Sequence, residues 1–372
     1  MPHDPYRALY LHIPFCASRC AYCDFMTRAV DRDDPRITSY VEDMVMQIRR
    51  AGKAGDLASV ETVYLGGGTP TYVGGKHLSQ ILYTVGLSMH LTEDVECTVE
   101  ANPESLDERL VRDLWALGAN RLSIGVQSFD DALLKMLGRA HTADDARRAI
   151  AAAQTRFENV SVDVMCGLPG QTLEQFESTL REAVASGATH VSVYPLTVED
   201  HTLFANMVAA GEIDEPDDDV EADMMKLASD VLSVAGFTRY EVANYARPGF
   251  ESRHNTAYWS GLPYIGIGTS AATMTQNDQR RMRVQDDQVT DDLDARQMAA
   301  EDLMLAMRMT RGVDAVLLER ALRLLPEARK TLDDLVARGL ASYDEAARAY
   351  RPTERGWLCG NELYGDLYAL AP

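Results

Sequence analysis

The sequence predicts an α/β protein, in which a partial (β/α)6 barrel is followed by a small α+β domain that resembles a winged helix. Three observations predict this fold. Apolar β-type runs alternate with helical patterns through the first two thirds of the 372 residues, each run ends in a segment rich in Gly, Pro, Cys or polar residues, and short helices with a hairpin follow from about residue 296. Strands that alternate with helices form parallel sheets through right-handed crossovers.

Six apolar runs are the expected strands of the barrel, at residues 8–13, 61–65, 95–99, 121–126, 160–165 and 190–194. Helices are expected between them; one has apolar residues at 106, 110, 111, 114 and 117, a spacing that builds one helix face. In a β/α barrel the carboxyl ends of all strands meet on one face, where the chemistry lies, whereas a doubly wound sheet has its site at one switch point. Distinctive residues after all six strands favour the barrel.

The last third of the chain is expected to hold an extension of the barrel and a separate domain. Residues 212–221 are acidic and predict an exposed loop before a helix over 222–234. We expect the barrel with its extension (about 200–285) to occupy residues 1–285, a polar linker to occupy 286–295, and the winged-helix-like domain to occupy 296–372. In that domain a hairpin over 341–351 precedes a last helix from Thr353.

Composition and charge exclude several classes of protein. With 46% apolar and 25% charged residues the chain is not disordered, and no run of about 20 apolar residues predicts a membrane span. The first residues lack a basic segment typical of secretion, so we expect a cytoplasmic protein. A net charge of −21 disfavours binding to nucleic acid, including DNA binding by the winged-helix-like domain, and to anionic lipid.

Three of the six cysteines are close together, in the pattern Cys16-x3-Cys20-x2-Cys23. Three thiolates on one tight loop suit three corners of a cubane iron–sulfur cluster and leave the fourth iron without a protein ligand. Structural zinc normally takes four Cys or His ligands, so zinc with His12 as the fourth ligand is the alternative. Without a secretory signal no disulfides are expected, and small buried thiols are predicted for the scattered cysteines Cys97, Cys166 and Cys359.

The cysteine motif, after a first barrel strand and with Tyr22 just before the last cysteine, resembles the radical S-adenosylmethionine (SAM) superfamily. Segments 10–16, 66–70, 124–129, 167–172 and 240–259 together resemble the oxygen-independent coproporphyrinogen III oxidase family. The resemblance implies a barrel of the radical SAM type. It also implies one [4Fe–4S] cluster held by the three cysteines, with SAM at the open iron.

The resemblance also implies which residues surround SAM, without naming a catalytic residue. Gln127 and Asp163 are expected at the ribose hydroxyls of SAM, and Arg139 near its carboxylate. The glycine turn, residues 66–69, lets the backbone approach the methionine end of SAM. The full set of expected SAM contacts is Tyr10, Tyr22, Gly66, Gly67, Gly68, Thr69, Glu100, Gln127, Arg139 and Asp163. Productive cleavage of SAM would require an electron donor such as flavodoxin or ferredoxin.

Two departures indicate the heme chaperone branch of the family. The true dehydrogenases have Cys-Gly-Cys where this chain has Cys23-Asp24-Phe25, and they carry an N-terminal arm where only 15 residues precede Cys16 here. The branch implies a protein that binds heme and passes it to an acceptor, such as a respiratory cytochrome. His254 is the expected axial heme ligand; its alternative is a loop histidine bonded to the backbone. The alternative functions are oxidative decarboxylation of coproporphyrinogen III propionates and a zinc-stabilised barrel.

Overall fold

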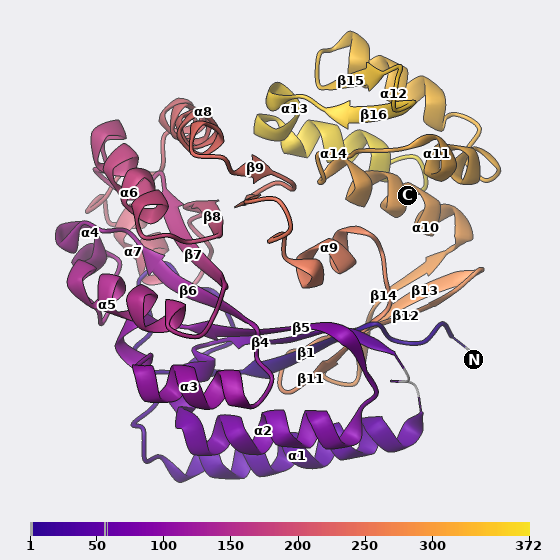
Figure 1. Ribbon diagram of the computed structural model, residues 1–372. Helices are drawn as coiled ribbons and strands as arrows, with labels where there is room; N and C mark the ends of the chain where they lie inside the picture. The colour runs from indigo at the N-terminus through magenta and orange to yellow at the C-terminus, as the bar shows by residue number, and fades with distance from the viewer. Residues whose placement is uncertain (1–2, 56, 58) are drawn as a thin grey trace.

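Six parallel strands, paired in chain order, form the centre of the structure (Figure 1). The computed structural model describes residues 3–55, 57 and 59–372. All six predicted strands are present. Their bounds are β1 (Ala8–Ile13), β4 (Val60–Gly67), β5 (Leu91–Ala101), β6 (Arg121–Gln127), β7 (Asn159–Cys166) and β8 (His190–Pro195).

The first helices pack on the outer face of these strands, as the figure shows for α1, α2 and α3. Along β1, Leu9 and Leu11 belong to the apolar core shared with the helices, whereas Tyr10 faces the opposite, inner side and stacks near Tyr64 of β4. This alternation follows from the two-residue period of a strand. The helices are α1 (Pro35–Ala54), α2 (Gly74–Ser88), α3 (Glu108–Ala116), α4 (Asp131–Met136), α5 (Ala143–Gln154) and α6 (Leu173–Ala185).

The sheet continues at both edges instead of closing, so the barrel is partial. Beyond β8 lie two short antiparallel strands, and beyond β1 lie one parallel strand and an antiparallel meander. Helix α9 lies on the inner side of the sheet, opposite α1 and α2 (Figure 1). These elements are α7 (Leu203–Ala209), α8 (Asp218–Val234), β9 (Thr238–Arg239), β10 (Asn244–Ala246), α9 (Arg253–Trp259), β11 (Tyr264–Ile267), β12 (Ala272–Asn277), β13 (Arg280–Gln285) and β14 (Gln288–Asp294).

The predicted linker over 286–295 is wrong. Asp286 and Asp287 have positive φ angles of 47° and 62° and form a hairpin turn, and the residues after them pair with β13 as strand β14. Helix α10 then begins directly at Ala295, with Asp294 as its N-cap. Strand β14 is at the edge of the sheet and most of its side chains are exposed, so its sequence lacks the apolar alternation of a half-buried strand.

The acidic loop predicted over 212–221 is also partly wrong. Helix α8 begins at Asp218 because the Asp217 side chain accepts hydrogen bonds from the N–H groups of Asp219 and Val220. Acidic residues at a helix N-terminus are favourable as caps and toward the helix dipole. The negative charges therefore indicated a helix start and not a loop.

The C-terminal residues form short helices around a hairpin, in the predicted order. They have an apolar cluster of their own that includes Leu303, Leu332 and Leu363, all fully buried. The predicted last helix is two helices. The elements are α10 (Ala295–Met307), α11 (Ala315–Leu322), α12 (Ala328–Ala337), β15 (Ala341–Asp344), β16 (Ala349–Pro352), α13 (Glu354–Leu358) and α14 (Gly360–Tyr368).

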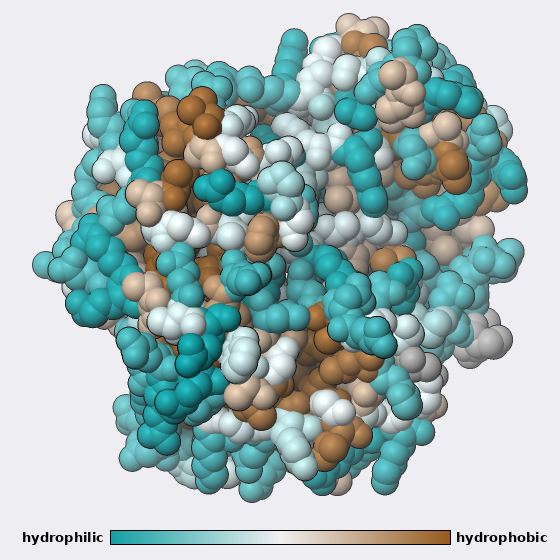
Figure 2. All heavy atoms as spheres, in the orientation of Figure 1, coloured by the Kyte–Doolittle hydropathy of each residue, from teal (hydrophilic) through white to brown (hydrophobic). Residues whose placement is uncertain are grey.

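Hydrophilic side chains cover most of the face in Figure 2, as expected for a chain with a net charge of −21. Among the residues that the structure describes, none of the helices has the length and apolar composition needed to cross a membrane.

A buried ion pair lies where the sheet meets α10. Arg281 of β13 is 2% exposed and pairs with Glu301 and Asp302 of α10.

This buried ion pair gives a first prediction. We expect Arg281→Met to lower the free energy of unfolding by about 2 kcal/mol, because it removes the buried cation between Glu301 and Asp302 and leaves each carboxylate with one partner, Arg283 or Arg320. Urea denaturation measures the change. The control is Arg280→Met, since Arg280 is the neighbouring residue and pairs with Asp292 in solvent; an equal effect of the two variants would contradict the prediction.

Candidate functional site

The three clustered cysteines lie on the loop between β1 and α1. Cys16 ends the short strand β2 (Phe15–Cys16), which pairs with β3 (Arg28–Ala29) and so brings the two ends of the loop together. The middle of the loop is also fixed, because the Ala21 N–H donates to the carbonyl of Leu137 (3.0 Å) and the Ala21 carbonyl accepts from the N–H of Phe204 (2.9 Å). The loop is therefore anchored to two other parts of the barrel.

The three thiols are free, partly exposed and close enough to influence one another. Burial raises the pKa of Cys16 to about 11, and the neighbouring charges of Cys23 and Cys20 act in the same direction. Such thiols ionise only with compensation from a metal or a cation. In the part of the chain that the structure describes, no group of three or more His, Cys, Asp or Glu side chains is placed to hold a metal ion. A cubane cluster binds each thiolate at a separate iron, so its ligands need not converge on one ion.

A chain of hydrogen bonds joins two of the cysteines across the barrel. Thr69 donates to the Cys16 sulfur (3.5 Å) and accepts from the Asn102 side-chain amide (3.0 Å). Arg139 donates to the Asn102 side-chain oxygen (2.7 Å), to the carbonyl of Gly125 (2.6 Å) and to the Cys20 sulfur (3.5 Å). The guanidinium thus places a positive charge beside the cysteine loop, and its hydrogen bonds connect this loop with β6.

Tyr22 joins the same group of residues. It lies against Arg139 and Cys20, and burial raises its pKa. Asn102, which has the central place in the hydrogen-bond chain, was not predicted as a site residue. Its position directly after the third strand marks the carboxyl edge of the sheet, but its hydrogen-bond partners follow from the strand register.

At the glycine turn, which begins in the last residues of β4, the backbone lies very close to neighbouring groups. Gly67 has a φ of 108°, and a Cβ atom there would lie 2.4 Å from the His12 ring. A Cβ on Gly66 would lie 3.0 Å from the carboxylate of Glu100, and one on Gly68 would lie 2.9 Å from the backbone of Phe15. Glycine is required at residue 67, where φ is positive and an added Cβ overlaps a ring, and at residue 68, where the nearest atoms are backbone.

His12 is fully engaged by its neighbours. Its Nδ1 is hydrogen-bonded to the Tyr10 hydroxyl (3.0 Å) and its Nε2 to the carbonyl of Met26 (3.0 Å). Neither ring nitrogen is available as the fourth zinc ligand considered from the sequence. Tyr10 and the glycine turn are thereby joined through one imidazole ring.

The predicted acidic residues lie on the inner side of β5 and β7, the two strands that flank β6. Glu100 accepts from the Tyr64 hydroxyl (2.7 Å) and the Gly67 N–H (3.1 Å), and burial raises its pKa to about 7. Asp163 accepts from the Ser123 hydroxyl (3.2 Å to each oxygen), and burial raises its pKa as well. Gln127 ends β6 with a φ of 65°, an uncommon conformation for a residue with a side chain.

His254 is on helix α9 and is 1% exposed. Its Nδ1 is hydrogen-bonded to the Thr62 hydroxyl (2.8 Å) and its Nε2 to the Tyr258 hydroxyl (3.0 Å), while its ring stacks on Tyr64 with centroids 4.9 Å apart. Burial lowers its pKa to about 3, so the ring is neutral. Ligation of heme iron by His254 would require that one of these hydrogen bonds breaks and that the ring leaves the interior.

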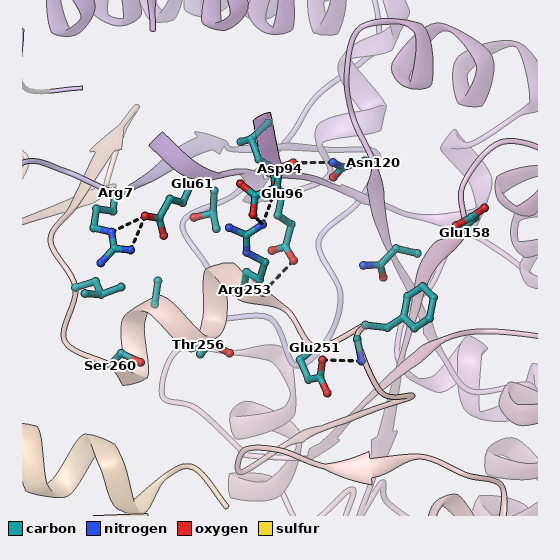
Figure 3. Close-up of a pocket in the computed structure, with 17 residues that line it drawn as sticks. Arg7, Glu61, Asp94, Glu96, Asn120, Glu158, Glu251, Arg253, Thr256 and Ser260 are labelled. Carbon is teal, nitrogen blue, oxygen red and sulfur yellow. Dashed lines mark hydrogen bonds and ion pairs between the residues drawn. The ribbon is translucent and has the colours of Figure 1, made fainter. Parts of the chain in front are cut away.

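A cavity lies away from the cysteines, at the amino ends of the strands (Figure 3). It measures about 590 Å³ and is bordered by the outer face of α9. Its two arginines are paired, Arg7 with Glu61 and Arg253 with Asp94, and Glu96 accepts from the N–H groups that begin α9 (2.9 and 3.0 Å). None of the predicted site residues lines this cavity.

Comparison with known proteins identifies the family. The Radical SAM superfamily model matches residues 10–183. The protein named Heme chaperone HemW from Bacillus subtilis (strain 168) is 34% identical, over 96% of this chain and 98% of that protein. Its namesake from Escherichia coli (strain K12) is 33% identical, over 96% of this chain and 97% of that protein. The chain belongs to the HemW family.

A solved structure supports the same fold for this HemW-family chain. Coproporphyrinogen III oxidase (HemN) from Escherichia coli, a radical SAM enzyme, aligns with a TM-score of 0.79 at 22% identity, over 100% of this chain and 90% of that one. The predicted radical SAM fold is therefore confirmed. Membership of the superfamily implies a [4Fe–4S] cluster and SAM. Three free, partly exposed thiols on one loop, the glycine turn and the inward carboxylates are of the kinds that bind these groups.

The glycine turn gives a second prediction. We expect Gly67→Ala to lower the free energy of unfolding by about 2 kcal/mol more than Gly118→Ala, because a Cβ at residue 67 overlaps the His12 ring. Gly118 is the matched control, since it also has a positive φ (94°) but nothing within 4 Å of its added Cβ. Urea denaturation of both variants measures the difference; equal losses would show that only φ matters at residue 67.

The raised pKa of Glu100 gives a third prediction. The folded protein keeps this carboxyl protonated up to about pH 7, whereas the unfolded chain releases the proton near the ordinary value of 4.5. The folded state therefore binds more protons between these values, and the contribution of Glu100 to stability falls as the pH rises through this range.

Replacing the carboxyl removes this dependence. We expect Glu100→Gln to gain stability relative to the natural protein between about pH 5 and about pH 8, as measured by urea denaturation at both values. Glu93→Gln, an exposed position on the same strand, is the control. A stability difference for Glu100→Gln that is independent of pH would contradict the prediction.

Proposed function

We propose that this protein is a heme chaperone, which binds heme and transfers it to an acceptor protein. The observation that carries the proposal is the similarity to Heme chaperone HemW from two bacteria over 96% of the chain. The matches span the barrel and the C-terminal helices alike, so the proposal rests on the whole chain. We further propose a cytoplasmic protein with a respiratory cytochrome as the class of acceptor.

The proposed resident cofactors are one [4Fe–4S] cluster on Cys16, Cys20 and Cys23 and SAM at its open iron. When bound, the reduced cluster supplies one electron to SAM. Arg139 and Thr69 donate to two of the sulfurs and thereby offset the negative charge of thiolate ligands. An electron donor such as flavodoxin or ferredoxin is needed only if SAM is cleaved.

The chain's own residues offer SAM a polar, shaped surface. The glycine turn lets the backbone come close to a ligand, with its N–H groups at Gly67 and Gly68 held by Glu100 and by the Ile13 carbonyl. Glu100 is already positioned by Tyr64 and Gly67. We propose Gln127 and Asp163 for the ribose hydroxyls and Arg139 for the methionine carboxylate. The proposed SAM surface in full is Tyr10, Tyr22, Gly66, Gly67, Gly68, Thr69, Glu100, Gln127, Arg139 and Asp163.

The second candidate function is radical decarboxylation of coproporphyrinogen III. The observation in its favour is the likeness in fold to coproporphyrinogen III oxidase. The sequence Cys23-Asp24-Phe25 argues against it, because the residue two places after the third cysteine is a phenylalanine that is 70% exposed. We therefore favour the chaperone.

The proposal gives a fourth prediction. Protein purified without oxygen should contain about four irons with matching acid-labile sulfide per chain, bind heme, and pass heme to an apocytochrome without consuming coproporphyrinogen. Cys20→Ser should lose most of the iron. Cys359→Ser, which changes a partly exposed thiol outside the loop, is the matched control.

Three results separate the alternatives. Zinc without iron would support the zinc-stabilised barrel. Turnover of coproporphyrinogen would support the dehydrogenase. Iron and sulfide without heme binding would support the proposed cluster but refute the proposed chaperone function.

A further inference from the structure

Two large apolar side chains are exposed directly after the third clustered cysteine. Phe25 is 70% exposed and Met26 is 52% exposed, on a chain whose net charge is −21. Both lie in the bend that connects Cys23 with strand β3. An exposed apolar pair beside a candidate cofactor loop is a feature that the cysteines and the SAM surface leave unexplained.

The backbone of this bend is fixed although its side chains are exposed. The Met26 carbonyl is hydrogen-bonded to His12 Nε2 (3.0 Å). The Phe25 N–H and the Thr27 hydroxyl lie close enough to the Cys23 thiol to influence it. The polar groups of the bend thus face the barrel and the cysteine, which leaves the phenyl ring and the thioether pointing outward in a preset arrangement.

The charges beside the bend complement an anionic apolar ligand. Two cations, Arg19 and Arg28, are exposed on either side of it and outnumber the one exposed carboxylate within it, Asp24. The Arg19 guanidinium donates to the Cys23 carbonyl (3.2 Å). A heme presents a flat apolar ring, an iron atom and two propionates. An aromatic side chain can pack on the flat ring, a methionine sulfur is an established ligand of heme iron, and arginines pair with the propionate carboxylates.

We propose that the Phe25–Met26 bend is the heme-binding surface of this protein, with the Met26 sulfur as an iron ligand. This inference rests on the proposed chaperone function and names the place of its cargo. Met26 offers iron a sulfur atom at the surface, whereas His254 has both ring nitrogens hydrogen-bonded in the interior. The heme-binding surface and the cysteine loop then lie on one short segment of the chain.

The test is titration of the anaerobically purified protein with heme, followed by absorption spectroscopy. We expect Met26→Leu to weaken heme binding about tenfold and to abolish the spectral signature of thioether ligation. Met26→His should keep the affinity and change the spectrum to that of an imidazole ligand, since it restores a ligand at the same place. Met46→Leu on α1 is the matched control, because Met46 has a similar exposure of 47%.

A second pair of variants tests the apolar contact. Phe25→Ser should weaken heme binding without changing the type of ligand, whereas Leu87→Ser, at 69% exposure on α2, should leave binding unchanged. The iron content of every variant is measured in parallel, so that damage to the neighbouring cysteine loop is recognised. Unchanged iron with weakened heme binding is the expected result.

Two outcomes overturn the inference and leave the chaperone proposal standing. One is heme binding by Met26→Leu and Phe25→Ser that matches the natural protein in affinity and spectrum. The other is a spectrum that changes in His254→Ala but not in Met26→Leu. Failure of the natural protein to bind heme would instead refute the proposed function itself.

Discussion

The site depends on one constraint, which is that polar side chains on the inner face of a parallel sheet must find partners away from bulk water. The outer face of the six strands is apolar and packs on helices. The inner face carries Tyr64, Glu100 and Asp163, and each is hydrogen-bonded to a residue on a neighbouring strand or turn. Because the strands are paired in chain order, the register of the sheet decides which of these groups meet. The glycine turn is fixed by one of these contacts, because Glu100 accepts from the Gly67 N–H.

The sequence predicted the six strands because buried parallel strands are continuous apolar runs, whose composition reflects burial directly. It failed for β14, where edge position and exposure remove that pattern, and for the start of α8, where acidic residues serve as caps and first-turn residues. The site residues were predicted from motifs, and the structure brings Cys16, Thr69 and Arg139 into one network. Asn102 completes that network but was missed, because hydrogen-bond partners follow from strand register and not from local sequence.

The position of His254 also depends on a contact that local sequence does not reveal. The sequence predicted an axial heme ligand, with a loop histidine bonded to the backbone as the alternative, whereas His254 lies on a helix and its ring is hydrogen-bonded to two side-chain hydroxyls. The fold instead turns the helix inward, because Glu96 accepts the N–H groups of Arg253 and His254 at the helix start. A carboxylate on a strand far away in the sequence thus decides whether this histidine faces solvent or the interior, and no pattern within residues 253–259 records that contact.

The inward position of α9 bears on where a porphyrin can meet the protein. Tyr10, Tyr64, His254 and Tyr258 form a column of rings on the inner side of the sheet, with successive centroids between 4.8 and 6.2 Å apart. Their polar groups are hydrogen-bonded, Tyr10 to His12, Tyr64 to Glu100 and His254 to Tyr258, so a large apolar ligand entering there would have to displace both packing and hydrogen bonds. At the rim, the bend after Cys23 offers apolar surface at no such cost, since its backbone is already bonded and its side chains already face outward. A chaperone must release its cargo, and a rim site, unlike an interior one, allows release without opening the barrel.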